Sequence, residues 1–345
     1  MKRLLTISLL LLTLFCSAQQ RRALLVGIAN YPEESGWRKI HADNDVRLLD
    51  SILSKSFHVR SIVDEQATLK NILNEFSYLR QSTSRGDTIL ISFSCHGQQM
   101  YATDNTTEPD SLDEALIPYG AEAKYSSNYK GEKHLRDDVL SDHVSKIREK
   151  AGAKGLVLVL LDACHSGDSF KDVKESNHYR GGYPVFGPEN TKKNVYKDLK
   201  NIVKLSDSND LSDVVFISAC QSYQLNAEYK NTEGKWYGSL IYAFATAYEK
   251  DGLNDIASLC MDIKSNVESF NKSTRQSPEF ATTIDSILES LIDSTIVDTT
   301  IVDTTKVTSG TSDKNDKFVS PKYWLICVVI LLILILIVTY IWKKK

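Results

Sequence analysis

The sequence predicts an α/β fold in which a mostly parallel sheet is flanked by helices. Two runs, Thr88–Phe93 and Val157–Leu161, consist largely of Val, Ile and Leu, which is typical of strands buried on both faces of a parallel sheet. Strand-like runs also alternate with segments of helical periodicity, the order that right-handed crossovers produce. A long uncharged run near the carboxyl end adds one expected transmembrane helix.

The individual elements follow from local patterns. Apolar residues recur at helical spacing within Asp43–Leu53 and Leu69–Leu79, and aspartates cluster at the start of the first of these segments. Further helices are expected at 135–150, 240–248 and 256–267, and further strands at 23–28, 57–63 and 213–220. The polar stretches Gln98–Lys133 and Lys171–Ser212 predict long loops, the second of them exposed and open to cleavage.

Both ends of the chain resemble membrane-targeting segments. Residues 1–18 begin with Lys2 and Arg3, continue through an apolar core and end in small residues, as a secretory signal does. A lipid anchor at Cys16 is the alternative there. Residues 323–342 are 20 uncharged residues with Tyr and Trp at both edges, followed by three lysines. We therefore expect a single-pass membrane protein with its body outside the cytoplasm, periplasmic or on the cell surface, and its carboxyl terminus inside.

These segments divide the chain into four parts. A signal peptide (1–18) precedes a folded domain (19–292), a Thr/Asp/Ser-rich stalk (293–320) and the membrane helix with its basic tail (321–345). The formal charge of −3 gives no reason to expect nucleic-acid binding. A monomer is expected. The four cysteines of the body show no dense disulfide framework, so mostly free thiols are expected.

Two polar turns at strand ends carry the candidate chemistry. The strand ending in Asp162 is followed by Cys164, and the strand at 88–93 is followed by His96 and Gly97. Carboxyl ends of parallel strands meet at one edge of a sheet, where such folds bind their ligands. An imidazole can activate a thiol for nucleophilic attack. The backbone N–H groups of Gly97 and Cys164 are the candidate oxyanion hole.

The residues at these two strand ends could also form a metal site. Cys95, His96, Cys164 and His165 form two Cys-His pairs that together offer four zinc ligands. Neighbours on an extended chain point in opposite directions, however, so one ion would not easily reach both members of each pair.

The motifs resemble those of caspase-like cysteine peptidases, and specifically the metacaspases. Ser94-Cys95-His96-Gly97 and Asp162-Ala163-Cys164-His165-Ser166-Gly167 match the family's two catalytic motifs, and the resemblance extends from about residue 22 to 248. It implies a caspase-hemoglobinase fold, Cys164 as nucleophile and His96 as general base and acid. Cys95 stands where a glycine is usual.

The resemblance also implies a substrate preference and a metal. Metacaspases cleave after Arg or Lys through an acidic pocket, and the matching positions are Asp45, Ser94 and Asp162. Many metacaspases bind calcium through acidic residues. Asp137 and Asp138 match part of that site, but Lys171 stands where an aspartate is expected. Calcium at Asp137 and Asp138 is therefore an open expectation, and it is not predicted to be required.

The expected function is a membrane-anchored cysteine endopeptidase that acts on proteins or peptides with a basic residue at the cleavage site. Residues 171–212 resemble the linker between the two segments of this family, so self-cleavage is expected there, for instance after Lys174, Arg180 or Lys193. The alternative is a catalytically silent relative that binds peptides or a partner protein. A Cys164 trapped in a disulfide, or a cleft blocked by the loop at 98–133, would favour that alternative.

Overall fold

The computed structural model describes residues 19–101, 112–164, 178–188, 202–205, 208–221, 224–272 and 274–299. The described residues up to Asp298 belong to one compact unit built on a seven-stranded sheet in the order β2-β1-β3-β7-β9-β12-β8. The strands are β1 (Arg21–Gly27), β2 (His58–Val63), β3 (Thr88–Ser94), β7 (Leu156–Asp162), β8 (Ile202–Lys204), β9 (Asp213–Ser218) and β12 (Glu279–Thr282). β2, β1, β3, β7 and β9 pair in parallel, which confirms the mostly parallel sheet.

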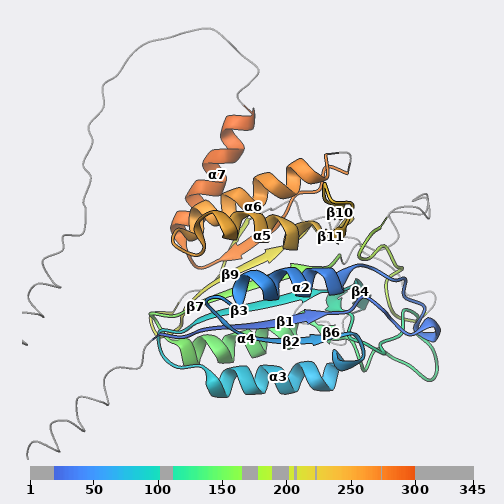
Figure 1. The fold of residues 1–345 in the computed structure, drawn as a ribbon. Helices are drawn as coiled ribbons and strands as arrows, with labels where there is room; N and C mark the ends of the chain where they lie inside the picture. Colours follow the sequence, from blue (N-terminus) through green and yellow to red (C-terminus); the bar gives the residue numbers. More distant parts are fainter. Residues whose placement is uncertain are drawn as a thin grey trace, which may run out of the picture. The chain divides into compact units, whose positions relative to one another are not determined.

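Helices cover both faces of this sheet (Figure 1). They are α2 (Ala42–Leu53), α3 (Leu69–Ser82), α4 (Asp137–Ala151), α5 (Ser239–Asp251), α6 (Ile256–Phe270) and α7 (Asp285–Thr299). α3 and α4 lie on one face, and α2, α5 and α6 lie on the other. Local capping supports the helix starts, because Thr68 accepts a hydrogen bond from Asn71 N before α3 and Asp255 accepts one from Ser258 N before α6.

Side chains that alternate along the central strands contribute to two apolar layers, one on each face of the sheet. In β7, Val157 and Val159 face the layer under α3 and α4, whereas Leu158 and Leu160 face the layer under α2 and α5. All four side chains are fully buried. Burial on both faces explains why the strand is continuously apolar, and it places the ends of β3 and β7 at one edge of a well-packed sheet.

Three parts of the structure differ from the sequence-based expectations. The stretch at 98–133, expected to be irregular, contributes β4 (Gly97–Tyr101) and β5 (Leu112–Leu116) to a small antiparallel sheet, completed by β6 (Leu135–Arg136). Consequently the helix expected from residue 135 begins at Asp137. β12 pairs antiparallel with β9, so the large sheet is mixed at one end. These short strands are set by pairing with distant partners, and no local periodicity reveals them.

The remaining elements lie toward the carboxyl end of the domain. A hairpin of β10 (Glu228–Lys230) and β11 (Trp236–Gly238) leads directly into α5. α7 continues to Thr299, past the domain boundary expected at 292. No helix within the described residues is long and apolar enough to cross a bilayer, and the signal and the membrane helix expected at 1–18 and 323–342 lie outside those residues.

Candidate active site

The two expected catalytic residues lie on neighbouring strands. β3 and β7 pair in parallel with Ser94 opposite Asp162. His96 follows β3 by two residues and Cys164 follows β7 by two residues, so both side chains are carried to the same edge of the sheet. Both are fully buried. Strand register therefore places both residues at the same edge of the sheet.

His96 is held in one orientation by its surroundings. Its Nε2 lies 2.8 Å from the carbonyl oxygen of Arg38, and its ring stacks on Trp37 with centroids 5.2 Å apart. A carbonyl oxygen only accepts, so Nε2 carries the hydrogen and Nδ1 bears the lone pair. Nδ1 has no hydrogen-bond partner among the described residues. Burial lowers the pKa of His96 to about 4, so the ring is neutral at pH 7 and Nδ1 is available as a base.

Cys164 is a free thiol in this structure. Its Sγ donates to the carbonyl oxygen of Gln224 at 3.0 Å, and Cys220 Sγ approaches the same oxygen at 3.5 Å. The hydrogen bond with Cys164, together with burial, raises the pKa of Cys220 well above its ordinary value. The described cysteines, Cys95, Cys164, Cys220 and Cys260, are all free, which confirms the expectation of free thiols and removes the disulfide argument for a silent protein.

The three residues expected to form the acidic pocket do converge, and an arginine of the same chain fills the space between them. Arg180 Nη2 lies 2.6 Å from Asp45 Oδ2, and Nη1 lies 3.4 Å from Asp162 Oδ1. Ser94 Oγ accepts a hydrogen bond from Nη1 and donates one to Asp45. A fourth residue, Glu228, completes the pocket, with its Oε1 3.0 Å from Nη2.

The pocket is a desolvated ion cluster. The side chains of Arg180, Asp162 and Glu228 are 0% exposed. Burial raises the pKa of Asp45 to about 6 despite the opposing charge of Arg180. For Glu228, burial is outweighed by the hydrogen bond from His41 and the charge of Arg180, which lower its pKa to about 2. Excess carboxylate charge in a water-excluded cleft is a strong binding environment for one guanidinium.

The backbone around Arg180 lies along the cleft as an added strand. Arg180 N donates to Asn226 O at 3.0 Å and Glu228 N donates to His178 O at 2.8 Å, an antiparallel arrangement. Gly181 then passes directly over the thiol residue, with φ +147°, and a Cβ there would overlap the carbonyl oxygen of Cys164. Extended peptides bound by main-chain pairing are a common mode of substrate recognition.

This arrangement corrects the expectation that residues 171–212 are exposed throughout. Within that range Arg180 is fully buried, because its charge is matched by carboxylates that only the folded chain assembles. Downstream of it, the Tyr183 ring packs on Trp37 with centroids 4.3 Å apart and lies edge-on to His96. The segment 178–183 therefore covers the cleft.

Gly238 forms a wall of the pocket, and its replacement by alanine is expected to disrupt it. A Cβ there would overlap the Asp162 carboxylate and lie 2.7 Å from Arg180 Nη1, while Gly238 N donates to Asp45 Oδ1 at 2.9 Å. We expect Gly238→Ala to lower the free energy of unfolding by about 1–3 kcal/mol. Urea denaturation of the uncleaved Cys164→Ala chain measures this, with the exposed Lys235→Ala as control. Equal midpoints for the two variants would contradict the expected contact.

Acid is expected to destabilise the domain through two buried histidines. Burial lowers the pKa values of His96 and His134 to about 4, so each contributes stability that is complete above pH 6.5 and is lost as the pH falls toward 4. By pH 4.5 each loss is about 2–3 kcal/mol, and the two together amount to about 5 kcal/mol. Asp45, with a pKa of about 6, acts in the opposite direction, because the folded state takes up its proton before the unfolded state does. Protonation of Asp45 therefore adds about 2 kcal/mol to the free energy of unfolding over the same pH range.

The net loss expected between pH 7 and pH 4.5 is therefore about 3 kcal/mol. Urea denaturation of the Cys164→Ala chain at both pH values measures it. His134→Gln should remove most of the pH dependence, since one histidine and Asp45 then nearly cancel. A dependence that is unchanged in this variant would show that other groups control acid stability.

The sequence offered two candidate metal sites, one for zinc and one for calcium. Among the described residues, one group of three His, Cys, Asp or Glu side chains is spaced to share an ion, namely His41, His178 and Glu228. The zinc alternative built on Cys95, His96 and Cys164 is therefore wrong for its described members. Asp137 and Asp138 lie in the first turn of α4 without a third described ligand, and Lys171 lies outside the described residues. The backbone positions expected for the oxyanion hole, at Gly97 and Cys164, begin β4 and follow β7.

Sequence reasoning missed Glu228 and the histidines that contact it. His41 directly precedes α2, and its Nδ1 lies 2.7 Å from Glu228 Oε2. None of these residues stands in a recognisable motif, and the fold brings positions 41, 178 and 228 together from three separate segments.

Comparison with known proteins identifies the family of this chain. The family described as Caspase domain matches residues 20–288. Metacaspase-2 of Trypanosoma brucei brucei is 26% identical over 227 residues, which cover 62% of this chain and 58% of that protein. Metacaspase-4 of Arabidopsis thaliana is 26% identical over 165 residues, which cover 45% of this chain and 35% of that protein. The chain thus spans little more than half the length of the first of these relatives and about a third of the second.

A solved structure supports the fold alone. The crystal structure of a Geobacter sulfurreducens protein covers 78% of this chain and 96% of its own, with a TM-score of 0.51 and 22% sequence identity. The matched family region contains the parallel sheet, the strand ends that carry His96 and Cys164, and the acidic pocket. The chain therefore belongs to the caspase-domain family, and within that family it is of the metacaspase type.

Proposed function

We propose that this protein is a cysteine endopeptidase that cleaves after arginine or lysine, and that its own Arg180–Gly181 bond is one of its substrates. The observation that supports this most is the position of Arg180, whose side chain fills the acidic pocket while Gly181 lies over Cys164. A basic side chain in the acidic pocket, followed by a glycine that lies against Cys164, supports the proposal that this segment is a substrate.

The chemistry uses the groups at the strand ends. His96 Nδ1 takes the proton of the Cys164 thiol, and the thiolate attacks the carbonyl carbon of the basic residue. The N–H groups of Gly97 and Cys164 stabilise the negative oxygen that forms. His96 then gives the proton to the departing amine, leaving an acyl-enzyme that water hydrolyses. Arg38 O, which accepts from Nε2, keeps the ring in the tautomer that this transfer needs.

The preference for a basic residue follows from the pocket charges. Asp45, Asp162 and Glu228 surround a single guanidinium, and a carboxylate in its place would face three like charges. Lysine would make fewer of these contacts, because the ammonium lacks the planar fork that bridges two carboxylates. Arginine is therefore expected to be the better substrate.

Self-cleavage is part of this proposal. Of the three candidate bonds in the linker, the one after Arg180 lies within the described residues, and those after Lys174 and Lys193 lie outside them. In the structure Cys164 Sγ points to Gln224 O, so it must rotate toward the peptide before attack. Cleavage after Arg180 would free the downstream segment that covers His96.

The test is a set of fluorogenic peptides with Arg, Lys or Asp before the scissile bond, offered to the full-length chain and to Cys164→Ala. We expect cleavage after Arg and Lys at least a hundredfold faster than after Asp, and no cleavage by the variant. Chains that self-cleave should yield a fragment ending in Arg180 by mass spectrometry. Cleavage after Asp would contradict the pocket assignment, and activity that survives in Cys164→Ala would contradict the nucleophile.

The membrane topology stays a separate proposal. It rests on the apolar run at 323–342, the lysines that follow it and the signal-like residues 1–18. We propose that the peptidase domain lies outside the cytoplasm and is anchored by this run. Extraction of the expressed chain from membranes at alkaline pH would contradict an integral anchor, whereas retention that is lost on deletion of 321–345 is the expected result.

A further inference from the structure

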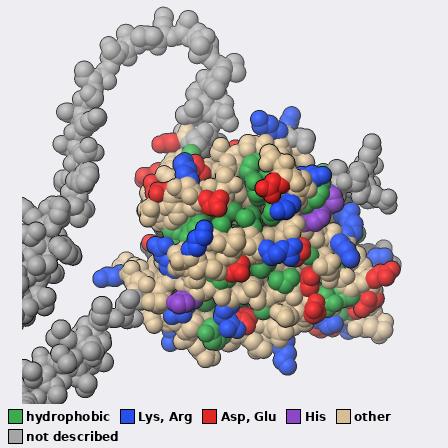
Figure 2. Space-filling view, in the orientation of Figure 1, with side chains coloured by type: hydrophobic (Ala, Val, Ile, Leu, Met, Phe, Trp, Pro, Cys, Tyr) green, Lys and Arg blue, Asp and Glu red, His purple; other side chains and the backbone are tan. Residues whose placement is uncertain are grey.

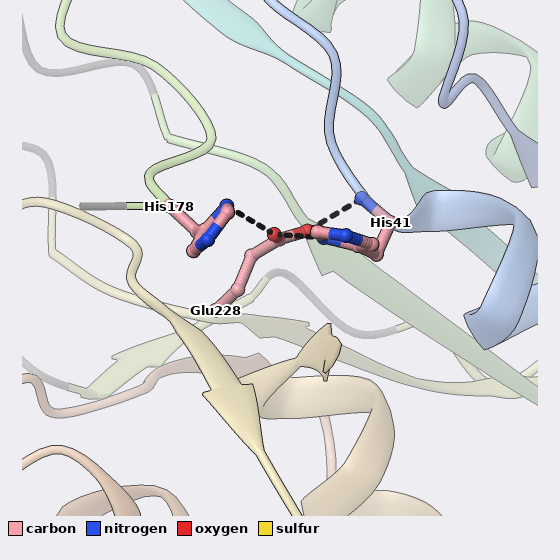
Figure 3. Close-up of side chains that lie close together, drawn as sticks. All are labelled: His41, His178 and Glu228. Carbon is pink, nitrogen blue, oxygen red and sulfur yellow. Dashed lines mark hydrogen bonds and ion pairs between the residues drawn. The ribbon is translucent and has the colours of Figure 1, made fainter. Parts of the chain in front are cut away.

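A second cluster of side chains lies beside the pocket, formed by His41, His178 and Glu228 (Figure 3). Nδ1 of His41 is 2.7 Å from Glu228 Oε2, and Nδ1 of His178 is 3.7 Å from the same oxygen. The three ligand atoms all lie within 4.8 Å of one another. They come from the residue before α2, from the linker and from β10.

The spacing suits a tetrahedral zinc ion. Zinc with nitrogen and oxygen ligands at about 2.0–2.1 Å places those atoms about 3.3 Å apart, and the observed separations lie on both sides of this value. Two imidazoles and one carboxylate are a donor set that Zn²⁺ favours and that Ca²⁺ and Mg²⁺ do not. Water would take the fourth position.

The local charge and the exposure of the two histidines also favour a bound divalent cation. Asp45, Asp162 and Glu228 face one guanidinium, which leaves a formal excess of two negative charges for a divalent cation to offset. Glu228 Oε1 is engaged by Arg180 and by His41 N, and Oε2 is the oxygen that faces the imidazoles. The side chains of His41 and His178 are 34% and 38% exposed, and histidines reach the surface on the face shown in Figure 2. An ion can therefore enter from solvent.

The three candidate ligands come from two different parts of the chain. Glu228 and His41 belong to the body of the domain, whereas His178 lies two residues before Arg180 on the segment that occupies the cleft. Trp236 packs on both imidazoles, with ring centroids 4.1 Å from His178 and 6.1 Å from His41, and this limits their rotation. An ion held by all three residues would tie the segment to the domain.

We propose that His41, His178 and Glu228 bind a Zn²⁺ ion that fastens residues 178–181 in the cleft. The consequence for activity rests on the proposed peptidase function, but the binding and the fastening do not. Since the complete site exists only while the segment is docked, zinc shifts the docking equilibrium by a factor of 1 + [Zn²⁺]/Kd.

Binding is tested on the full-length Cys164→Ala chain, which does not cleave itself and offers no thiol at position 164. Zinc titration by calorimetry and the visible d–d absorption of added Co²⁺ report affinity and geometry. We expect one site whose affinity falls at least tenfold in His178→Gln and in His41→Gln, with loss of the tetrahedral Co²⁺ band. His58→Gln, an exposed histidine on β2, is the matched control. Equal affinity in all four proteins would mean an adventitious ion only, and would overturn the proposal.

Fastening is tested with added trypsin, which needs no activity of this protein. Cleavage of the Cys164→Ala chain after Arg180, followed by mass spectrometry, should slow about a hundredfold at a zinc concentration of 100 Kd. The same chain with His178→Gln should show no slowing. Zinc that binds without protecting Arg180 would overturn the fastening role. Failure of the peptidase assay would leave both measurements unaffected, so the two proposals can fail separately.

Discussion

Replacing Arg180 with glutamine is expected to lower the free energy of unfolding of the uncleaved chain by about 3–5 kcal/mol. Its guanidinium is fully buried and contacts Asp45, Asp162 and Glu228. Removing it leaves these carboxylates in a water-excluded site without their main counter-charge, and such uncompensated burial is among the largest costs that a single substitution produces. Urea denaturation at pH 7 in the Cys164→Ala background measures the loss.

Two comparisons make this result specific. Arg47→Gln removes an ion pair with Asp43 whose arginine side chain is 66% exposed, and it should cost no more than about 1 kcal/mol. The Arg180→Gln penalty should also shrink at pH 5, where the unpaired carboxyls take up protons. A penalty no larger than that of Arg47→Gln would mean that Arg180 does not occupy the pocket in solution.

Replacing Asp162 with asparagine is expected to reduce kcat/KM for arginine peptides by about 10²–10³-fold. Asp162 Oδ1 accepts from Asn226 Nδ2 at 2.6 Å and Oδ2 accepts from Ile241 N at 2.9 Å. Asparagine removes the charge that faces the substrate and also turns an amide donor toward one of these two donors. The pocket thus loses both its attraction for a guanidinium and its internal order.

Steady-state kinetics with matched Arg and Lys peptides measure this effect. Asp142→Asn, an exposed carboxylate on α4 paired with Lys146, is the control and should leave kcat/KM unchanged. Loss of binding should appear as a raised KM for both peptides. Unchanged kcat/KM in Asp162→Asn would place the specificity pocket elsewhere in the cleft.

The amino-acid sequence by itself was enough for the parallel core and the two catalytic candidates. β3 and β7 are continuously apolar because both of their faces are buried, and that pattern is visible without a structure. Parallel strands share an edge for their carboxyl ends, so topology alone predicts that His96 and Cys164 lie at the same edge of the sheet. Asp45, Ser94 and Asp162 followed from the family resemblance, and the structure brings all three around one guanidinium.

Only the tertiary structure revealed what occupies the cleft. Arg180 lies in a polar stretch that favours an exposed loop, and nothing near it in sequence could offset the cost of burying its charge. Glu228, 48 residues away, and Asp45 supply that compensation once the domain has folded. The His41, His178 and Glu228 cluster and the antiparallel strand β12 depend in the same way on partners that are distant in sequence. Local periodicity determines which face of an element is buried, whereas pairing between buried charges depends on distances that only the folded chain sets.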